Sequence, residues 1–465
     1  MIQLHPNTNQ AYQLLHDGTL ALARAERQGI RVDVDYLKKK AKHLTRKIDY
    51  LEDKLMTTKF YRRWSHTVQG KPNMHSDPQL RTYLYSVLKL EPSKKTKTGM
   101  GSTDEEALLD LGIPEMRDLI QIKKLKNMRD TFLAGFEREQ VDGYIHPFFN
   151  LNLVTTFRSS SDRPNFQNIP NRDKELMKLT RSALYPRPGH QLLEMDFSGL
   201  EVCIAACYHE DPTMIKYIKD PTSDMHGDMA AQLYMIDNFN RKLPEHNHLR
   251  KASKNGFVFP QFYGDYSGNC ADYLTGRWGE LPHGKWKPGQ GVRLPEGHLS
   301  DHLISKGYKN VQGFADHVKR VEQDFWENRF PVYAKWKDSW WAQYQKLGYL
   351  HTKTGFTCSG VMSKNDAINY PVQGAAFHGL LWSFIRLDAL MYREGWKSRL
   401  IGQVHDSIVF DIYPPELEMV LQIAKRTTTV DLPKHWTWIN VPLNIDAELC
   451  GVDESWANKK EIEIP

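Results

Sequence analysis

The sequence contains no apolar run that approaches the roughly 20 residues of a membrane span. It also starts with neither a basic cluster nor an apolar stretch, which excludes a secretory signal. Cysteine is scarce: the five cysteines are scattered, odd in number and never spaced as CxxC. This pattern excludes a disulfide framework and a zinc ribbon. It favours a reduced, cytoplasmic protein with no membrane partner.

The chain otherwise has an ordinary composition with a slight excess of positive charge. It has 465 residues, of which 40% are hydrophobic and 25% charged, and its net charge is +6. This length exceeds what one hydrophobic core usually serves, so we expect several subdomains. The net charge mildly favours a nucleic-acid partner, although many basic proteins bind none.

Apolar periodicity changes along the chain and indicates an α+β fold, with helices around a small antiparallel sheet. The helices we expect span residues 8–29, 34–59, a segment capped by Thr103, 114–139, 200–210, 246–258, 311–346, 365–395 and 415–428. The strands we expect lie near 143–157, at 191–197, in a hairpin at 347–358, in two strands with a tight turn at 398–413, and near 442–449. Residues 265–310 are rich in Gly, Pro and Trp, which predicts an irregular insertion.

Two acidic residues stand at the ends of apolar strands. The segment LLEMDFSGLE delivers Asp196, and LIGQVHDSIVF delivers His405 and Asp406 to the turn between two strands. Packing does not need an acid there, although a turn aspartate is more often only turn chemistry. Two Mg²⁺ ions about 3.5–4 Å apart can drive an in-line displacement at phosphorus. Because Mg²⁺ takes few carboxylates and keeps phosphate oxygens as ligands, the pair predicts such a site, with Mn²⁺ as an alternative ion.

A third segment, RKASKNGFVFPQFYGDY, combines cations with aromatic rings. Arg250 and Lys254 are four residues apart and share one helix face, so together they can clamp a triphosphate. The aromatic side chains that follow can stack on a base. Taken alone, the segment is more often an amphipathic helix with exposed cations.

In this order, these segments resemble the family A DNA polymerases, the group of bacterial DNA polymerase I and many phage replicases. DFSGLE and QVHD resemble two palm motifs, and R-x₃-K followed by F-x₃-YG resembles the fingers helix. Four further segments match: KKTKTGMGSTDEEAL, TTFRSSSDRPNFQNIPNR at 155–172, INYPVQGAA at 368–376, and SDMHGDMAA with a DxH-like pair at Asp224 and His226. The likeness runs from about residue 20 to 450, and chance does not produce so many motifs in order.

The resemblance implies a right-hand polymerase fold, with palm, fingers and thumb around a small antiparallel sheet. It implies these boundaries: an N-terminal palm-associated helix at 1–33, the thumb at 34–140, a first palm part at 141–210, the fingers at 211–359 with the irregular insertion near 265–310, and a second palm part at 360–465.

The resemblance also implies roles for individual residues. Asp196 and Asp406 are the implied catalytic metal ligands, which hold two Mg²⁺ ions. The residues implied to contact the incoming nucleotide are Arg250, Lys254 and His226 at the triphosphate, Phe259 and Tyr263 at the base, and Glu201 at the sugar. The residues implied to contact primer–template DNA are Arg158, Asn369, Gln373, Gln403 and His405, with Lys123 and Lys124 in the helix at 114–139.

Two positions depart from the family pattern near the acidic pair. Ser407 stands where the family often has Glu, so a third carboxylate is absent there and Asp196 and Asp406 must suffice. Gly199 replaces a common Gln.

The fingers segment departs in spacing. One extra residue separates Lys254 from Phe259, and Pro260 follows. An extra residue turns the following helix face by about 100°. We therefore predict a π-bulge or local break between Asn255 and Phe259 that returns Phe259 to the nucleotide side. The ring that covers the base stays open among Phe257, Phe259 and Phe262.

Together, the sequence predicts a DNA polymerase that adds dNTPs to a primer 3′ end, in phage genome replication. A single-subunit RNA polymerase is the first alternative, disfavoured because Glu201 would crowd a ribose 2′-hydroxyl. An inactive DNA-binding accessory subunit is the second, disfavoured by the retained acids and cations. Because the family pattern begins almost at Met1, we expect no proofreading nuclease in this chain and a separate 3′–5′ exonuclease polypeptide as a partner. For a phage protein, the expected location is the host cytoplasm.

Overall fold

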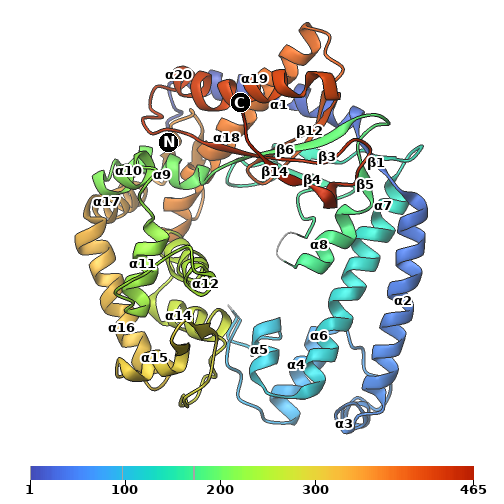
Figure 1. Cartoon of the computed structure of the whole chain (residues 1–465), viewed down its shortest axis with the longest axis vertical. Helices are drawn as coiled ribbons and strands as arrows, with labels where there is room; N and C mark the ends of the chain where they lie inside the picture. The colour runs from blue at the N-terminus through green and yellow to red at the C-terminus, as the bar shows by residue number, and fades with distance from the viewer. Residues whose placement is uncertain (1, 97, 171–172) are drawn as a thin grey trace.

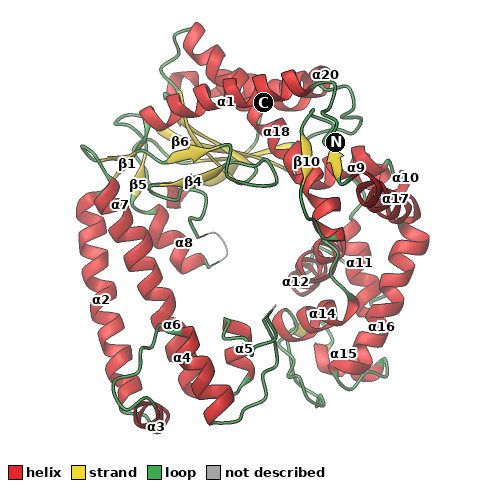
Figure 2. Cartoon of the chain, turned by 180° about the vertical axis from the view of Figure 1, so that it is seen from behind, coloured by secondary structure: helices red, strands yellow, loops and turns green. Residues whose placement is uncertain are grey.

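The computed structural model describes residues 2–96, 98–170 and 173–465. Lys97 of the KKTKTGMGSTDEEAL segment, and Asn171 and Arg172 at the end of the 155–172 segment, lie outside these residues. In Figure 1, a five-stranded sheet lies at the top, and two helical arms descend from it and approach each other at their far ends. The same arrangement is visible from behind in Figure 2. No helix in the described part of the chain is long and apolar enough to cross a membrane.

The central sheet is antiparallel and brings distant segments together in the order β11-β12-β6-β13-β14. Its strands are β6 (Gln191–Phe197), β11 (Arg399–Val404), β12 (Ser407–Ile412), β13 (Ile445–Leu449) and β14 (Lys460–Ile462). The expected strands at 191–197, 398–413 and 442–449 are therefore confirmed, whereas β14 was not expected. In this register Asp196 of β6 has Ser407 of β12 on one side and Asp446 of β13 on the other.

The sheet is packed against the helices α1 (Thr8–Gln28) and α18 (Lys364–Arg393). Every residue of β12 is buried, as expected for a central strand with both faces covered. Ser363 begins α18 with a capping box to Asp366, so this long helix has a well-defined start. The expected helices at 8–29 and 365–395 are confirmed.

Smaller strands and helices surround this core. A second sheet has the order β2-β1-β5, from β1 (Ile30–Val32), β2 (Tyr144–Ile145) and β5 (Leu184–Tyr185). Two hairpins pair β3 (Phe148–Asn150) with β4 (Ser160–Asp162), and β9 (Tyr349–His351) with β10 (Thr357–Ser359). The remaining helices near the sheet are α8 (Lys174–Arg181), α9 (Leu200–His209), α10 (Pro212–Lys219), α19 (Leu417–Arg426) and α20 (Leu432–His435).

The first arm, residues 34–140, is a group of helices on the right in Figure 1. Its helices are α2 (Val34–Met56), α3 (Lys59–Thr67), α4 (Asp77–Arg81), α5 (Glu105–Asp110), α6 (Pro114–Asn127) and α7 (Ala134–Glu139), with π-helical segments at 82–87 and 128–133. In α2 the apolar seam that steps by three and four is buried and packs on α6. The expected cap at Thr103 is wrong: the carboxylate of Asp104 caps α5 by accepting from the Ala107 amide at 2.9 Å.

The second arm, residues 211–359, lies on the left in Figure 1. Its helices beyond α10 are α11 (Met225–Tyr234), α12 (Pro244–Ser253), α13 (Phe259–Phe262), α14 (Ser267–Asp272), α15 (Leu299–Ser305), α16 (Val311–Asp324) and α17 (Pro331–Leu347). The segment 265–310 is less irregular than expected. It contains α14, a π-helical continuation at 273–277, the short hairpin β7 (Arg293–Leu294) and β8 (Gly297–His298), and the start of α15. Helical periodicity was missed there because each element is short.

Candidate active site

The two aspartates predicted from the sequence meet at one end of the central sheet. Asp196 is the penultimate residue of β6, and Asp406 lies in the two-residue turn between β11 and β12. The amide of Phe197 donates to the carbonyl oxygen of Asp406 at 3.2 Å, which ties the turn to the end of β6. His405 in this turn has a φ of +54°, a left-handed conformation that is uncommon for a residue with a side chain. Strain of this kind clusters at functional sites because the surrounding structure must hold it.

The aspartate pair carries unfavourable charge repulsion. Burial and the nearby charge of Asp406 raise the pKa of Asp196 to about 7, with further contributions from Glu194 and Asp446. Burial also raises the pKa of Asp406, while Arg158 and His405 oppose that effect. A cation between the two carboxylates would relieve this repulsion, as expected for a metal-binding pair.

Sequence reasoning missed further acids beside Asp196. Glu194 lies on the same face of β6, and Asp446 lies directly across from Asp196 on β13. The Ser198 hydroxyl donates to Asp446 at 2.6 Å. Position 407, where the family often has Glu, carries serine in this chain, but the carboxylate of Asp446 stands on the opposite side of Asp196. In the strand LLEMDF, alternate residues share a face, so the sequence could have placed Glu194 beside Asp196. The position of Asp446 follows only from the pairing of β13 with β6, which the sequence does not show.

A cationic cluster balances Glu194. Lys459 Nζ lies 2.6 Å from its carboxylate, Arg181 Nη1 lies 3.3 Å away, and the Trp456 indole donates to it at 3.0 Å. Although burial opposes ionisation, Lys459 and Arg181 hold the pKa of Glu194 below its usual value. These residues line a polar cavity of about 400 Å³ that opens beside Asp196 and Asp406.

The donor set suits Mg²⁺ without being a complete protein cage. Within the described residues, no three His, Cys, Asp or Glu side chains are arranged to hold a metal ion. Asp196 offers carboxylate oxygens from β6 and Asp406 from the β11–β12 turn. Mg²⁺ is commonly held by one or two carboxylates plus substrate phosphates and water. The residues present therefore fit ions that are completed by a phosphate substrate.

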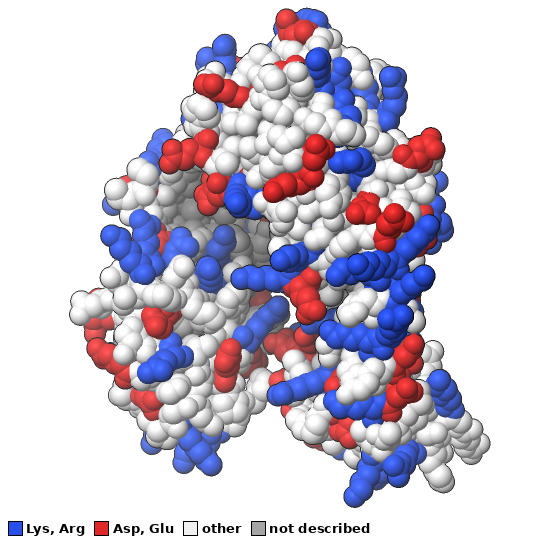
Figure 3. Space-filling view, turned by 45° about the vertical axis from the view of Figure 1, so that its right-hand side comes forward, with Lys and Arg blue, Asp and Glu red and all other residues white. Residues whose placement is uncertain are grey.

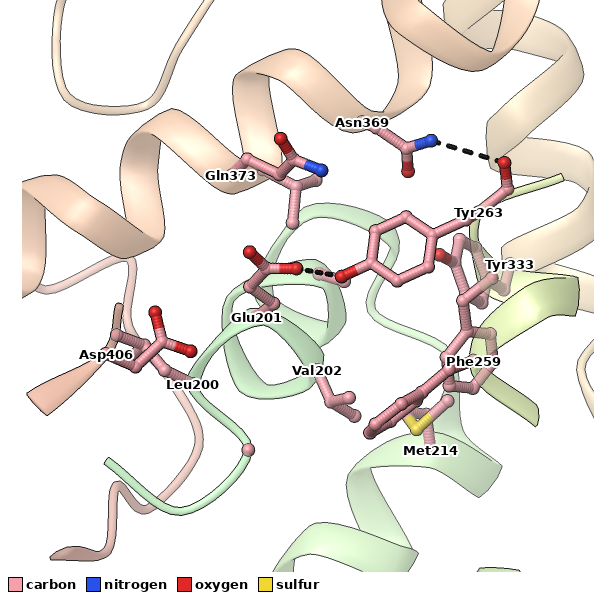
Figure 4. A pocket seen from close by; sticks show the side chains of 14 residues that line it. Leu200, Glu201, Val202, Met214, Phe259, Tyr263, Tyr333, Asn369, Gln373 and Asp406 are labelled. Atoms are coloured by element: carbon pink, nitrogen blue, oxygen red, sulfur yellow. Dashed lines mark hydrogen bonds between the residues drawn. The ribbon is translucent and has the colours of Figure 1, made fainter. Parts of the chain in front are cut away.

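A second cavity, of about 140 Å³, lies next to Asp406 and collects several of the predicted residues. Figure 4 shows Glu201, Phe259, Tyr263, Asn369 and Gln373 around it. Glu201 comes from α9, and Phe259 and Tyr263 come from α13 and its C-cap. Asn369 and Gln373 come from α18. Three segments that are far apart in sequence thus form one site.

Glu201 is the polar centre of this cavity. Its carboxylate accepts a hydrogen bond from the Tyr263 hydroxyl, and its other oxygen pairs with the Arg158 guanidinium. The Asn369 amide donates to the Tyr263 carbonyl oxygen at 3.4 Å. A network of this kind fixes the position of every side chain in it.

The predicted cations Arg250 and Lys254 lie in the last turn of α12 and at its C-cap. Arg250 Nε donates to both carboxylate oxygens of Asp224, at 2.9 and 2.7 Å. Burial and then Arg250 lower the pKa of Lys254, while the charge of Asp196 opposes that effect. His226 is mostly buried, and its Nδ1 has no hydrogen-bond partner among the described residues. Burial, Lys254 and Arg250 lower the pKa of His226 to about 4, so it is neutral at pH 7.

The expected helix irregularity is present. A π-helical segment, η3 (Lys254–Val258), joins α12 to α13 and absorbs the extra residue. Phe259 then faces the cavity, where the Lys254 amine lies 5.1 Å from its ring centre. Phe257 is fully buried against Phe325, and Phe262 is buried among rings of the second arm. Of the three rings left open, Phe259 is therefore the most accessible.

Some predicted contact residues lie away from an open surface. Gln403 is 3% exposed, and its side-chain oxygen accepts hydrogen bonds from Ser159 at 2.9 Å and from Gln167. In this conformation Gln403 would not touch a ligand directly and would act by orienting Ser159 and Gln167. Lys123 and Lys124 lie on α6 and pair with Asp77 and Glu105. They are part of the first arm and far in the chain from the acidic pair. His405 is exposed beside Asp406.

Two glycines have conformational reasons to be there. Gly199, the residue that replaces a common Gln, has a φ of +63° and begins α9 in the left-handed region. At Gly374 an added Cβ would lie 2.6 Å from the carbonyl oxygen of Thr156. This close approach seats the Arg158 segment against α18, beside Gln373.

Comparisons with known sequences agree with the geometry. The sequence model described as DNA polymerase family A matches residues 34–274 and 323–458, leaving 275–322 unmatched. DNA polymerase I of Rhizobium leguminosarum is 25% identical over 446 residues, which cover 92% of this chain and 38% of that protein. DNA polymerase I of Aquifex aeolicus is 27% identical over 409 residues, which cover 87% of this chain and 61% of that protein. The chain thus spans less than two thirds of the length of these relatives.

A solved structure has the same overall architecture. It is the polymerase domain of Pol1 from M. smegmatis, in complex with DNA primer-template and dNTP. The TM-score is 0.71 at 23% identity, and the match covers 95% of this chain and 70% of that one. At this level of identity the likeness concerns the fold.

Proposed function

Because the chain belongs to DNA polymerase family A and has its right-hand fold, we propose that it extends a DNA primer by template-directed addition of dNTPs. The observation that carries this proposal is the meeting of Asp196 and Asp406 beside the cavity that contains Glu201, Phe259 and Tyr263. The relatives are DNA polymerases I, and the similar structure was solved with primer-template and dNTP.

Asp196 and Asp406 would hold two Mg²⁺ ions, with Mn²⁺ as an alternative. When bound, two such ions activate an attacking hydroxyl and stabilise the leaving phosphate. The protein contributes the fixed position of both carboxylates, through β6 and the β11–β12 turn. The raised pKa of Asp196 supports the assignment, because a cation would favour its ionised form.

Arg250, Lys254 and His226 would contact the triphosphate of the incoming nucleotide. Arg250 and Lys254 supply positive charge on one face of α12 and η3. His226 supplies a buried nitrogen that has no hydrogen-bond partner among the residues the structure describes, and a phosphate oxygen or its proton can satisfy it. Asp224 holds the Arg250 guanidinium in place before the nucleotide enters.

Phe259 and Tyr263 would flank the base, and Glu201 would lie against the sugar. The ring of Phe259 lies across the cavity from α9, and the Tyr263 hydroxyl is fixed by Glu201. A carboxylate held by two partners cannot move aside for an added 2′-hydroxyl. This rigidity favours deoxynucleotides.

The primer–template would lie against α18 and the Arg158 segment. Arg158, Gln373, Asn369 and His405 would reach minor-groove edges near the new pair, where acceptors are nearly the same for every base pair. Gln403 would act through Ser159 and Gln167, which it orients. Lys123 and Lys124 would bind phosphates farther along the duplex. To do so they would release the carboxylates of Asp77 and Glu105, with which they now pair.

The chain parts then take their usual polymerase roles. The central sheet with residues 141–210 and 360–465, and with the helix at 1–33, forms the palm. The first arm is the thumb, and the second arm is the fingers, with an insertion near 265–310. The proposal also includes a role in phage genome replication in the host cytoplasm. It further includes a separate 3′–5′ exonuclease polypeptide for proofreading.

Primer extension tests the proposal. Purified protein with Mg²⁺, a primed template and dNTPs should extend the primer, and Asp406→Ala should abolish extension while leaving folding and DNA binding intact. Ser407→Ala, one residue away, is the matched control and should stay active. NTPs in place of dNTPs distinguish an RNA polymerase. Extension by Asp406→Ala at a normal rate would refute the metal assignment, and no extension by the parent protein would favour an inactive accessory subunit.

A further inference from the structure

The ends of the two arms contact each other across the space below the sheet. His283 Nε2, in the second arm, lies 3.2 Å from Asp110 Oδ1 at the end of α5 in the first arm. Figures 1 and 2 show the regions of α5 and α14 facing each other at this point. A cavity of about 1440 Å³ is lined by residues of both arms beside this contact. With the sheet and the two arms, the contact closes a ring.

The second-arm side of the contact belongs to a segment that the family A sequence model leaves unmatched. His283 lies within residues 275–322, which the family A sequence model does not match, although it matches the chain on both sides. The contact is therefore not part of what family membership by itself implies.

The unmatched segment presents His283 on a firmly anchored loop. Leu281 and Trp286, on either side of it, are 4% and 3% exposed. The Leu281 amide donates to the Thr275 carbonyl oxygen at 2.9 Å, and the Trp286 amide donates to that of Lys309 at 2.8 Å. Two buried anchors five residues apart hold the intervening turn in a fixed position, so His283 does not reach Asp110 through loop flexibility.

Asp110 is similarly fixed on the first arm. Its neighbours Ala107 and Leu108 in α5 are buried, and its second carboxylate oxygen accepts from the Ser93 hydroxyl at 2.8 Å. Asp110 and His283 are 21% and 52% exposed, so the contact faces solvent. An exposed pair of this kind contributes little, which allows it to open and close.

Like charges on the two arms also keep the contact weak. Burial raises the pKa of Asp272 in the second arm; His283 opposes the effect, and Glu106 and Asp110 of the first arm add to it. Figure 3 shows acidic and basic side chains on the facing lobes where the arms meet. Carboxylates on both sides repel each other, so the His283–Asp110 contact forms against that repulsion.

We propose that the 275–322 segment is a clasp that closes the two arms around primer–template DNA and so keeps the polymerase on its template. This proposal rests on the proposed function, because a duplex must occupy the space between the arms. The weak His283–Asp110 contact lets the ring open to load DNA without a helper protein. While the clasp is closed, the enzyme cannot leave the DNA sideways and dissociates only by sliding to a DNA end.

Crosslinking the clasp tests whether the ring encloses DNA. All five native cysteines are buried, so in the variant Asp110→Cys/His283→Cys the two new thiols are the accessible ones. A short bismaleimide is added after the enzyme has bound a primed circular DNA, followed by a high-salt wash. The crosslinked enzyme should stay on the circle and leave after a restriction enzyme linearises it. Each single-cysteine variant with the same reagent is the matched control and should wash off.

Two results would overturn the clasp. One is failure of the double variant to crosslink, and the other is equal loss of crosslinked enzyme from circular and linear DNA. If the parent enzyme neither binds nor extends primed DNA at low salt, the proposed function itself fails, which is a separate outcome.

A second measurement needs no crosslink. With excess trap DNA, His283→Ala should shorten the product made per binding event by a factor of up to about 5, the upper value for one exposed contact of this kind. Single-nucleotide addition should be unchanged, because His283 is remote from Asp196 and Asp406. Lys285→Ala, an exposed neighbour on the same loop, is the matched control. Equal product lengths for the parent enzyme and His283→Ala would also count against the clasp.

Discussion

At the scale of single residues, the ionisation of Asp196 links stability to pH and to metal. Its pKa is raised from 3.8 to about 7 in the folded protein, so the folded state holds a proton that the unfolded state has lost. Between pH 4 and pH 7 the free energy of unfolding therefore falls as pH rises, and above pH 7 the full repulsion remains.

We predict that Asp196→Asn removes this penalty. In EDTA the variant should melt at a higher temperature than the parent protein at pH 8, with a smaller difference at pH 5. At pH 8, Mg²⁺ should narrow the difference in melting temperature between the variant and the parent, because only the parent keeps both carboxylates that would bind the ions. Asp316→Asn, on the surface of α16, controls for the loss of one negative charge. A variant that melts lower than the parent at both pH values would contradict the assigned repulsion.

Glu201 provides a second residue-scale prediction. Glu201→Ala removes side-chain bulk beside the sugar position and frees Tyr263 and Arg158. We expect the preference for dNTPs over NTPs to fall by about 10- to 100-fold, as for a pocket that has lost a specific contact. The measurement is the ratio of kcat/KM for the two nucleotides. Glu201→Gln keeps the bulk and should lie in between. An unchanged ratio in Glu201→Ala would exclude this residue as the sugar gate.

At the scale of elements, the π-helical segment η3 shows how a local irregularity preserves a site. The extra residue would rotate Phe259 away by about 100° in a regular helix. Widening the helix at Lys254–Val258 confines that change, so Phe259 faces the cavity and its ring centre lies 5.1 Å from the Lys254 amine.

Deletion of Asn255 tests this account. Asn255 is exposed within η3, and its removal should convert the segment to regular α-helix with little change in fold or nucleotide KM. Deletion of Lys251 is the control, because it breaks the four-residue spacing of Arg250 and Lys254. It should raise the KM for dNTPs by about tenfold or more, the effect of losing roughly 1.4 kcal/mol of binding. Equal damage from both deletions would mean that η3 does not act as the spacer.

At the scale of the whole molecule, an ion pair joins the N-terminal helix α1 to the long helix α18. Arg24 of α1 donates to Asp388 of α18 at 2.6 Å, and the Asp388 side chain is 5% exposed. The residues before position 34 lie outside the match to the family model, yet this pair and the packing of α1 on β11 join them to the sheet.

Arg24→Ala should therefore destabilise the whole protein. It leaves a buried carboxylate unpaired, and since Arg24 is partly exposed we expect a loss near the lower end of such effects, about 2–3 kcal/mol. Urea unfolding followed by circular dichroism measures it. Arg24→Leu/Asp388→Leu removes both charges and should recover part of the lost free energy of unfolding. If the single variant unfolds at the parent's urea midpoint, the pair does not hold α1 in place.

Much of the element order could be read from local patterns. The sequence predicted the helices at 8–29, 114–139 and 365–395 and the strands around LLEMDF and QVHD. Each of these segments has its own apolar periodicity, which does not depend on the rest of the chain. The cap at Asp104, the short elements within 265–310 and the strand β14 were missed. Each involves only a few residues, where neighbouring side chains compete for the same backbone groups and periodicity cannot accumulate.

The sequence by itself identified the residues that we propose to carry the chemistry. Asp196, Asp406, Arg250, Lys254 and Glu201 stand in ordered motifs whose residue types suit metal, phosphate and sugar. Only the tertiary structure decided which further groups join them. Strand register sets Asp446 beside Asp196, side-chain pairing encloses Gln403, and the approach of two arms brings His283 to Asp110. These arrangements depend on contacts between segments far apart in the chain. Such contacts are set by how sheets and arms pack together, which no local pattern specifies.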